Sequence, residues 1–254
     1  MTDARLITEV DGALLRITLN RPEKRNALSL ALLDEIGDVF RRHHDHELKC
    51  AVITGAGDRA FAAGGDLKEL DALRSRAEAR AMSTRVHATL DEIRYFPVPV
   101  IGALNGVALG GGAELAMACD IRIGAAHADL GLIQSQLALT TAWGGGIDLI
   151  NAVGNSAALA MLCSGRRLSA NEALALRLYE AVCPEDEAFN TFSDSFVADY
   201  LNKSIHVLRG YKATAAARRR KLHEELDDTA RDAFITAWVD DEHWAAAANA
   251  LKKK

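Results

Sequence analysis

Short apolar, β-branched runs alternate with helical patterns over the first two-thirds of the chain, and this order limits the fold most strongly. The runs "CAVITGAG" (50–57) and "VPVIGALNG" (98–106) are apolar almost throughout, which is typical of strands buried on both faces of a parallel sheet. Each run leads through glycines into a helical pattern, as the crossover between parallel strands requires. The 254-residue sequence therefore predicts an α/β fold.

Local signals predict the elements around these strands. The dipeptide Asp11-Gly12 lies between two stretches of alternating apolar residues, which favours a β-hairpin. Ser29 is a suitable N-cap for the helix that follows it. A longer helix is predicted from about Arg76 to Tyr95, because two prolines follow at once. The inner faces of the two helices would carry Leu30, Leu33, Ile36 and Phe40, and Met82, Val86, Leu90 and Ile93.

The last part of the chain has a different pattern. Beyond about residue 155 strand-like runs almost disappear and consecutive helices are predicted. We therefore expect a core over residues 1–190 and a helical region over residues 191–254. Trp238 and Trp244 are large apolar groups near the end of the sequence, which favours docking against another part of the molecule or another subunit.

Composition excludes several classes of function. A net charge of −5 argues against general nucleic-acid binding, because no excess positive field attracts a phosphate backbone. The basic stretch "ARRRK" (217–221) is interpreted as a solvated helix face. No apolar run approaches the roughly 18–20 residues of a membrane span, and no signal pattern opens the sequence. A cytoplasmic protein without membrane contact is therefore expected.

Cysteine and histidine positions indicate no metal site. The four cysteines are widely spaced and form no CxxC pair, so we expect buried thiols in a reducing compartment. The histidine cluster at 43, 44 and 46 lacks companion ligands at metal spacing and is expected to face solvent at a helix end. The cysteines are Cys50, Cys119, Cys163 and Cys183.

Two glycine-rich loops carry the chemistry. "AAGGDL" (62–67) and "LGGGAEL" (109–115) each follow a strand and open a helix. Unpaired N–H groups gather at such helix starts and favour an anionic oxygen. One N–H from each loop could stabilise a single oxygen as negative charge develops on it. Either loop alone also suits a tight turn, and neither has the G-x-G-x-x-G pattern of dinucleotide sites.

Four segments together resemble the crotonase family, the enoyl-CoA hydratases and isomerases. They are "RPEKRNAL" (21–28), "AFAAGGDLKEL" (60–70), "PVIGALNGVALGGGAELAMACDIRI" (99–123) and "AWGGG" (142–146). The resemblance implies a ClpP-like spiral of ββα units with a C-terminal helical trimerisation region. It also implies a homotrimer or a dimer of trimers, a coenzyme A (CoA) thioester as substrate, and no cofactor apart from that CoA.

The resemblance assigns roles to residues of this chain. The backbone N–H groups of Gly65 and Gly111 would bind the thioester oxygen. Asp66 is expected to cap the helix that begins at Leu67, beside the CoA site. Together with Asp66, the candidates for binding the substrate are Lys24, Arg25, Ala27, Leu28, Ala63, Leu67, Lys68, His87 and Trp143. His87 has Asp91 four residues later on its helix, so the two could pair, and a structural role for His87 is the alternative.

Proton transfer is the point at which this sequence departs from the family pattern. Glu114 matches the first of the two glutamates of the hydratases, but Gln134 stands where the second is expected. A carboxamide does not exchange a proton near neutral pH, although it can orient water. Three readings remain open. They are a hydratase-type lyase with a single glutamate, a decarboxylase of a substituted malonyl-CoA as "AWGGG" faintly suggests, and an acyl-CoA-binding protein with little catalysis.

Overall fold

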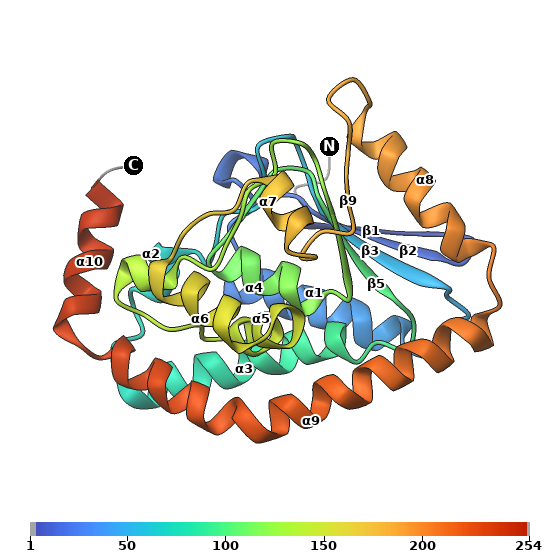
Figure 1. Cartoon of the computed structure of the whole chain (residues 1–254). Helices are drawn as coiled ribbons and strands as arrows, with labels where there is room; N and C mark the ends of the chain where they lie inside the picture. Colours follow the sequence, from blue (N-terminus) through green and yellow to red (C-terminus); the bar gives the residue numbers. More distant parts are fainter. Residues whose placement is uncertain (1–3, 253–254) are drawn as a thin grey trace.

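The computed structural model describes residues 4–252, apart from the side chains of Lys68 and of residues 251–252. Six strands form the main sheet in the order β1-β2-β3-β5-β7-β9, and the three short strands β4-β6-β8 form a second sheet (Figure 1). The strands of the main sheet are β1 (Leu6–Asp11), β2 (Leu14–Leu19), β3 (Cys50–Gly55), β5 (Val100–Leu104), β7 (Ile121–Gly124) and β9 (Ala181–Val182).

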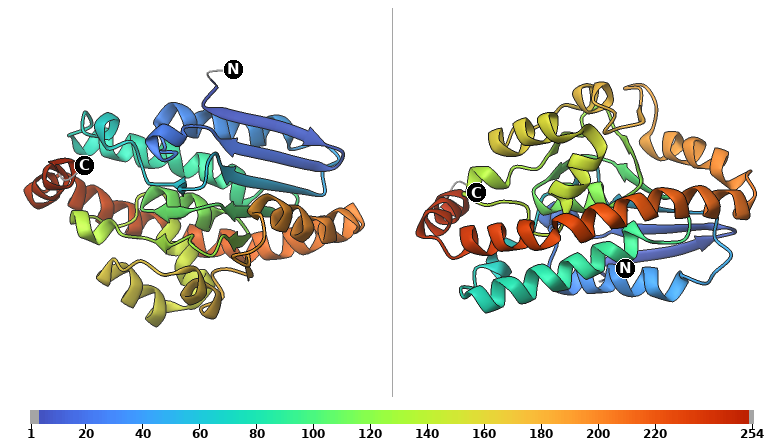
Figure 2. Two further views of the ribbon diagram at one scale, coloured as in Figure 1. Left: turned by 90° about the horizontal axis from the view of Figure 1, so that it is seen from above. Right: turned by 60° about the horizontal axis from the view of Figure 1, so that its bottom comes forward.

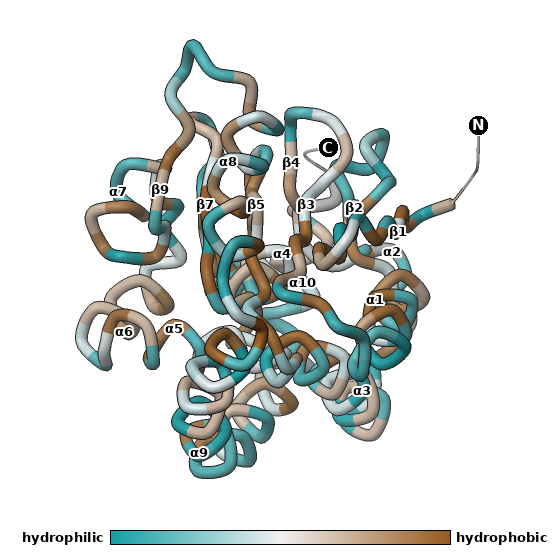
Figure 3. Tube along the Cα trace, turned by 90° about the vertical axis from the view of Figure 1, so that its right-hand side faces the viewer, coloured by the Kyte–Doolittle hydropathy of each residue, from teal (hydrophilic) through white to brown (hydrophobic). Residues whose placement is uncertain are grey.

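The main sheet confirms the predicted strand pattern. β1 and β2 pair as an antiparallel hairpin, with Gly12 at a φ of +55° in the turn. The neighbouring pairs from β2 to β9 are parallel. β3 and β5 are covered on both faces, so their residues are almost all buried. Figure 3 shows hydrophobic residues concentrated along these strands.

Helices cover the sheets, and local sequence explains where several of them begin. α1 (Leu30–His43) starts at Ser29, whose hydroxyl accepts a hydrogen bond from the Leu32 N–H. α3 (Arg76–Arg94) starts with a capping box between Ser75 and Glu78. The apolar residues predicted on the inner side of α3 are all buried. The following helices are α4 (Gly111–Ala118), α5 (Gly145–Val153), α6 (Asn155–Ser164) and α7 (Ala170–Ala175).

The C-terminal part is helical, as predicted. It consists of α8 (Phe189–Leu201), α9 (Ile205–Trp238) and α10 (Asp241–Lys252). The 34-residue helix α9 runs along α3 and α5 on one side of the molecule (Figure 2). Within residues 4–252 no helix combines the length and apolar character needed to cross a bilayer.

Two sequence-based expectations were wrong. The stretch 217–221 is not a solvated face throughout, because Arg219 is buried in α9 and donates hydrogen bonds to Asp148 and to two carbonyl groups of α4. Cys163 is exposed, whereas the other three cysteines are buried and all four are free thiols. Helical charge patterns do not show which basic residue faces the core, since that depends on the partner helix.

Candidate active site

The two glycine loops meet because they leave neighbouring parallel strands. β4 (Ala60–Ala62) pairs with β6 (Val107–Leu109), and β6 pairs with β8 (Leu130–Gly131). The first loop leads into the short helix α2 (Leu67–Leu70) and the second into α4. Gly64 has a φ of +111°, and a Cβ there would lie 3.9 Å from the Gly111 nitrogen. The predicted proximity of the two loops is therefore confirmed.

The amide groups of Gly65 and Gly111 are unengaged in the part of the chain that the structure describes. Neither N–H donates a hydrogen bond to a backbone or side-chain acceptor there. Both glycines are partly exposed, and Gly111 is the first residue of α4, where the helix dipole adds positive character. Two N–H donors are thus available near one another, as an oxyanion site requires.

The segment that was predicted to contact CoA runs beside the first loop. The Leu28 N–H donates to the Gly64 carbonyl at 2.9 Å, and the Asp66 N–H donates to the Leu28 carbonyl at 2.9 Å. The Ala63 N–H donates to Arg25, whose φ is +51°. The side chains of Lys24 and Arg25 are exposed, and that of Lys68 lies outside the described part. Ala27 and Leu67 are partly buried along the same edge.

Asp66 does not cap α2 in the predicted way. It occupies the N-cap position, but its carboxylate accepts no hydrogen bond from the backbone of that helix. The carboxylate instead accepts from the Arg21 guanidinium at 3.2 Å. Arg21 also donates to the Ala27 carbonyl at 2.6 Å. Asp66 thus ties the predicted CoA segment to the glycine loop, because a full guanidinium charge outcompetes a backbone N–H for the carboxylate.

Trp143 packs directly against both glycines. A Cβ on Gly111 would lie 2.5 Å from the indole Cη2, and one on Gly65 would lie 3.5 Å from the same atom. The indole is buried, and its Nε1 lies 3.4 Å from the Met82 sulfur. The indole therefore forms a fixed wall of the site and allows only glycine at position 111.

Substitution of the two glycines should have unequal effects. A Gly111→Ala change drives the new methyl group into a rigid, buried indole, so we expect a loss of about 1–3 kcal/mol in unfolding free energy and at least a roughly 10-fold loss of turnover. A Gly65→Ala change meets the end of the Leu70 side chain at 2.8 Å, which can rotate away. Gly65→Ala should therefore keep a higher free energy of unfolding, measured by chemical denaturation, and a higher turnover than Gly111→Ala. Equal damage from the two changes would contradict this geometry.

Glu114 lies on α4 and is buried. Its two carboxylate oxygens accept four hydrogen bonds from the segment 134–145. Burial raises the pKa of Glu114, and the four donors oppose that rise. The donors are Gln134 Nε2 at 2.8 Å and the Ala142 N–H at 3.2 Å on Oε1, and the Trp143 N–H at 2.8 Å and the Gly145 N–H at 3.0 Å on Oε2.

Gln134 is therefore next to Glu114. It begins the 3₁₀ helix η2 (Gln134–Leu137). Its amide nitrogen is used by Glu114, but its buried Oε1 has no hydrogen-bond partner among the described residues. An amide can turn over, so Gln134 can donate to an ionised Glu114 or accept from a protonated one. A glutamate at this position would place a second carboxyl group beside Glu114.

The loop of residues 142–145 contacts Glu114 on one side and His87 and Arg94 on the other. A Cβ on Gly145 would meet Glu114, whereas a Cβ on Gly144 would lie 2.8 Å from His87 Nε2 and 2.8 Å from Arg94. Gly144 has a φ of +88°, which suits glycine. His87 is thus separated from the glycine loops by this backbone. The structure places it in a buried group of charged residues with His223 and Asp227.

Asp148 is the centre of that charged group and was not predicted from the sequence. This side chain on α5 accepts hydrogen bonds from Arg94 at 3.0 Å, from Arg219 at 2.8 Å and from His223 at 2.8 Å. Burial disfavours its ionised form, but the two guanidinium groups outweigh burial and hold the pKa of Asp148 well below its usual range. The sequence does contain one indication of this buried charge, because Asp148 is an aspartate within the otherwise apolar start of α5.

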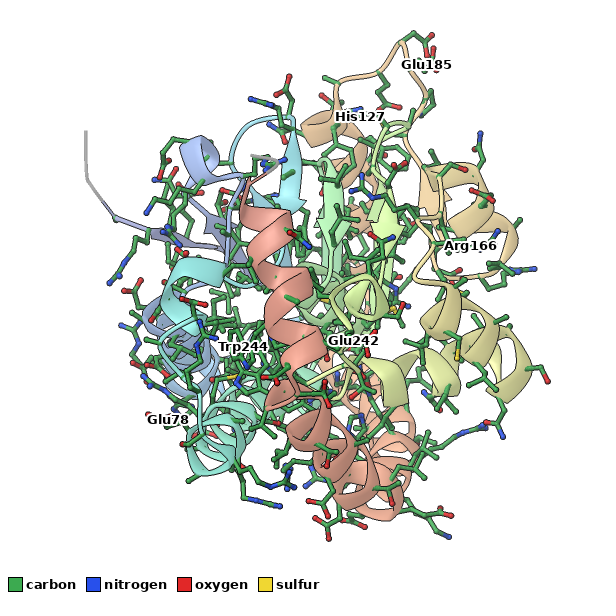
Figure 4. The ribbon with its side chains drawn as sticks, turned by 90° about the vertical axis from the view of Figure 1, so that its left-hand side faces the viewer. Glu78, His127, Arg166, Glu185, Glu242 and Trp244 are labelled. Atoms are coloured by element: carbon green, nitrogen blue, oxygen red, sulfur yellow. The ribbon has the colours of Figure 1, made fainter. Side chains whose placement is uncertain are left out.

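The end of α9 and the helix α10 pack against two earlier segments of the chain, at Leu73 and at the end of η2. The Trp238 Nε1 donates to the Leu73 carbonyl at 2.6 Å, and His243 Nδ1 lies 2.8 Å from the Leu137 carbonyl at the end of η2. Trp244 packs under the Arg74 guanidinium at 3.5 Å, on the side of α10 that faces α2 and α3 (Figure 4). Docking of these tryptophans within the chain was one of the two predicted arrangements.

Comparisons with known proteins agree with this architecture. A sequence profile described as enoyl-CoA hydratase/isomerase matches residues 9–243. YngF of Bacillus subtilis, named as an enoyl-CoA hydratase/isomerase, is 40% identical over 185 residues, 72% of this chain and 70% of that protein. The ethylmalonyl-CoA decarboxylase of Xenopus tropicalis is 25% identical over 249 residues, 98% of this chain and 83% of that protein.

A solved structure extends the similarity to the fold. The crystal structure of an enoyl-CoA hydratase/isomerase from Mycobacterium paratuberculosis superimposes with a TM-score of 0.88 at 27% identity. The match covers 96% of this chain and 98% of that one. The glycine loops, the two neighbouring sheets and the helical C-terminal region are thus those of the crotonase fold, and the chain belongs to the enoyl-CoA hydratase/isomerase family.

Proposed function

We propose that this enzyme binds an acyl-CoA thioester with its carbonyl oxygen between the N–H groups of Gly65 and Gly111. The absence of any acceptor for these two groups in residues 4–252 supports the proposal. Both donors would strengthen their hydrogen bonds as the carbonyl becomes an enolate. The exposed side chains of Lys24 and Arg25 are the proposed contacts of the CoA phosphates.

Decarboxylation of a 2-alkylmalonyl-CoA is the reaction that this site supports best. The observation that carries it is the pairing of a single carboxylate, Glu114, with the amide of Gln134. Hydration of a double bond needs one group to activate water and one to deliver a proton, and both are carboxylates in two-glutamate hydratases. Loss of carbon dioxide needs no base, because the breaking bond itself supplies the electrons of the enolate.

The proposed steps are balanced within the site. The bond between Cα and the free carboxylate breaks, its electron pair moves to form the enolate, and carbon dioxide leaves. The enolate oxygen rests on the Gly65 and Gly111 N–H groups. Cα then takes one proton, for which Glu114 is the proposed donor, and the Glu114 carboxylate regains a proton from water. Burial favours the acid form of Glu114, and Gln134 can turn to accept its O–H.

Hydratase activity is the second candidate, since YngF is named as an enoyl-CoA hydratase/isomerase. In that reaction Glu114 would act as both base and acid. An acyl-CoA-binding protein without turnover is the remaining alternative. In each case we propose a cytoplasmic protein that needs no cofactor besides the CoA of the thioester it binds. We also propose a trimer or hexamer built on residues 191–254.

A two-substrate assay tests the proposal. We expect purified protein to release carbon dioxide from 2-ethylmalonyl-CoA with a kcat/KM at least about 100-fold above that for hydration of a 2-enoyl-CoA, which corresponds to roughly 2.7 kcal/mol of preferential transition-state stabilisation. Carbon dioxide release and loss of the enoyl chromophore are measured on the same preparation. Preferential hydration would overturn the decarboxylase proposal, and thioester binding without either reaction would favour the binding protein.

The Gln134→Glu variant sharpens this assay. It places two carboxyl groups where nitrogen and oxygen now lie 2.8 Å apart, so that one of them stays protonated at neutral pH. Hydration should rise about 10-fold or more, because a second acid/base group becomes available. Decarboxylation should fall, since the added charge repels the carboxylate of the substrate. A variant that decarboxylates faster than the wild type would contradict the proposed role of the amide.

A further inference from the structure

Three potential metal ligands converge between α3 and α9, behind the loop that holds Glu114. His87 comes from α3, and His223 and Asp227 come from α9. Asp227 Oδ1 lies 3.1 Å from His87 Nε2 and 3.3 Å from His223 Nδ1. All three donor atoms lie within 4.8 Å of one another. The two distances from the Asp227 oxygen are close to the edge of a tetrahedron, about 3.3 Å for metal bonds of about 2.0–2.1 Å.

The orientation of the His87 imidazole ring favours binding of a metal ion over a hydrogen bond to Asp227. Its Nε2 is buried and has no hydrogen-bond partner within residues 4–252, although the Asp227 oxygen is only 3.1 Å away. The ring nitrogen therefore does not point along the line to that oxygen. A protonated Nε2 would be a buried donor without an aligned acceptor, which is unfavourable. Two ligands of one ion, in contrast, both point at a position off the line that joins them.

The outer nitrogens of both imidazoles face carboxylates. His223 Nε2 lies 2.8 Å from Asp148 Oδ1, and His87 Nδ1 lies 3.5 Å from Asp91 Oδ2. Asp148 lies between two guanidinium groups and holds the His223 ring by its Nε2 atom. His223 Nδ1 is thereby turned toward Asp227 Oδ1 at 3.3 Å, the side from which it would bind an ion shared with Asp227. A carboxylate behind each histidine is the usual support of histidine ligands in metal sites.

The Gly144 backbone packs closely beside these ligands, with the Arg94 guanidinium as a further neighbour. A Cβ on this residue would lie 2.8 Å from His87 Nε2 and 2.9 Å from His223 Cε1. We propose that His87, His223 and Asp227 bind one divalent transition-metal ion of the zinc type, with a water or hydroxide as fourth ligand. A set of two nitrogens and one carboxylate suits zinc and cobalt. The ion joins α9 to α3 and supports the Gly144 backbone, and this assignment is independent of the reaction catalysed.

Metal titration of chelator-treated, untagged protein tests the site. The background is Cys163→Ser, because that exposed thiol could bind zinc by itself. We expect one zinc per chain by elemental analysis and calorimetry, and a rise in Tm of about 5–10 °C when free zinc exceeds its Kd about 100-fold. Cobalt should give the intense visible bands of a four-coordinate nitrogen and oxygen site.

Three variants decide the assignment. Asp227→Asn and His87→Gln should each weaken zinc binding at least about 10-fold and abolish the four-coordinate cobalt spectrum. His44→Gln, in the exposed cluster at the end of α1, is the matched control and should bind as the wild type does. Unchanged zinc affinity in Asp227→Asn overturns the proposal. If a variant fails to fold, the wild-type cobalt spectrum still decides, because the pale spectrum of six-coordinate cobalt would show adventitious surface binding.

Discussion

Glu114→Gln should lose about 10²–10⁴-fold in turnover while the protein stays folded. The amide cannot deliver a proton, but it can be accommodated. If its nitrogen replaces Oε1, Gln134 can turn and offer the oxygen that now lacks a partner, so that only the 3.2 Å hydrogen bond from the Ala142 N–H is lost. The hydrogen bonds from Trp143 and Gly145 to the other oxygen remain. Tm should therefore change by only a few degrees, about 2–4 °C.

Steady-state kinetics and thermal unfolding of the same sample check this expectation. Glu47→Gln is the control, since Glu47 is exposed and should leave both measurements unchanged. If Glu114→Gln keeps wild-type turnover, Glu114 is only a structural partner of the 142–145 segment. A large fall in Tm together with the loss of turnover would mean that the segment itself has moved, and the acid role would lose its support.

Asp148→Asn should destabilise the protein by about 3–5 kcal/mol. The substitution removes the charge that faces Arg94 and Arg219, both of which are buried. Two guanidinium groups would then remain in the interior with too little compensation, since Asp91 pairs with Arg94 alone and Asp120 lies 3.7 Å from Arg219. For a chain of this size the corresponding fall in Tm is about 6–20 °C.

Denaturant unfolding of chelator-treated protein measures this effect apart from any bound metal. Asp194→Asn is the matched control, because Asp194 pairs with Arg16 at the surface and such pairs contribute about 0–1 kcal/mol. A loss below about 1 kcal/mol in Asp148→Asn would show that the charged group between α3, α5 and α9 is not a major source of stability.

Much of the fold could be predicted because its signals are local. Alternation around Gly12, the cap at Ser29 and the prolines after α3 each depend on a few neighbouring residues. The two glycine loops were also correctly expected to meet, since parallel strands end at the same edge. Arg219 could not be placed in this way, because its burial depends on an aspartate 71 residues earlier in the chain.

The site was predicted less completely than the fold. Gly65, Gly111, Glu114 and Gln134 were named as site residues because each belongs to a compact segment that resembles known proteins, and their roles stay predictions. The side chain of Asp66 was assigned to the wrong partner, since the sequence does not show how close Arg21 comes. The group around Asp148 combines three helices that are distant in sequence, so no window of residues contains its pattern.

The backbone at Gly144 separates two groups of residues that lie on opposite sides of one loop. One face belongs to the proposed proton donor Glu114 and the other to the histidines and arginines of α3 and α9. Any side chain at position 144 would have to displace Arg94 or His87, and the positive φ already disfavours one. A side chain at position 144 would therefore disturb both the loop that holds Glu114 and the packing of α3 against α9.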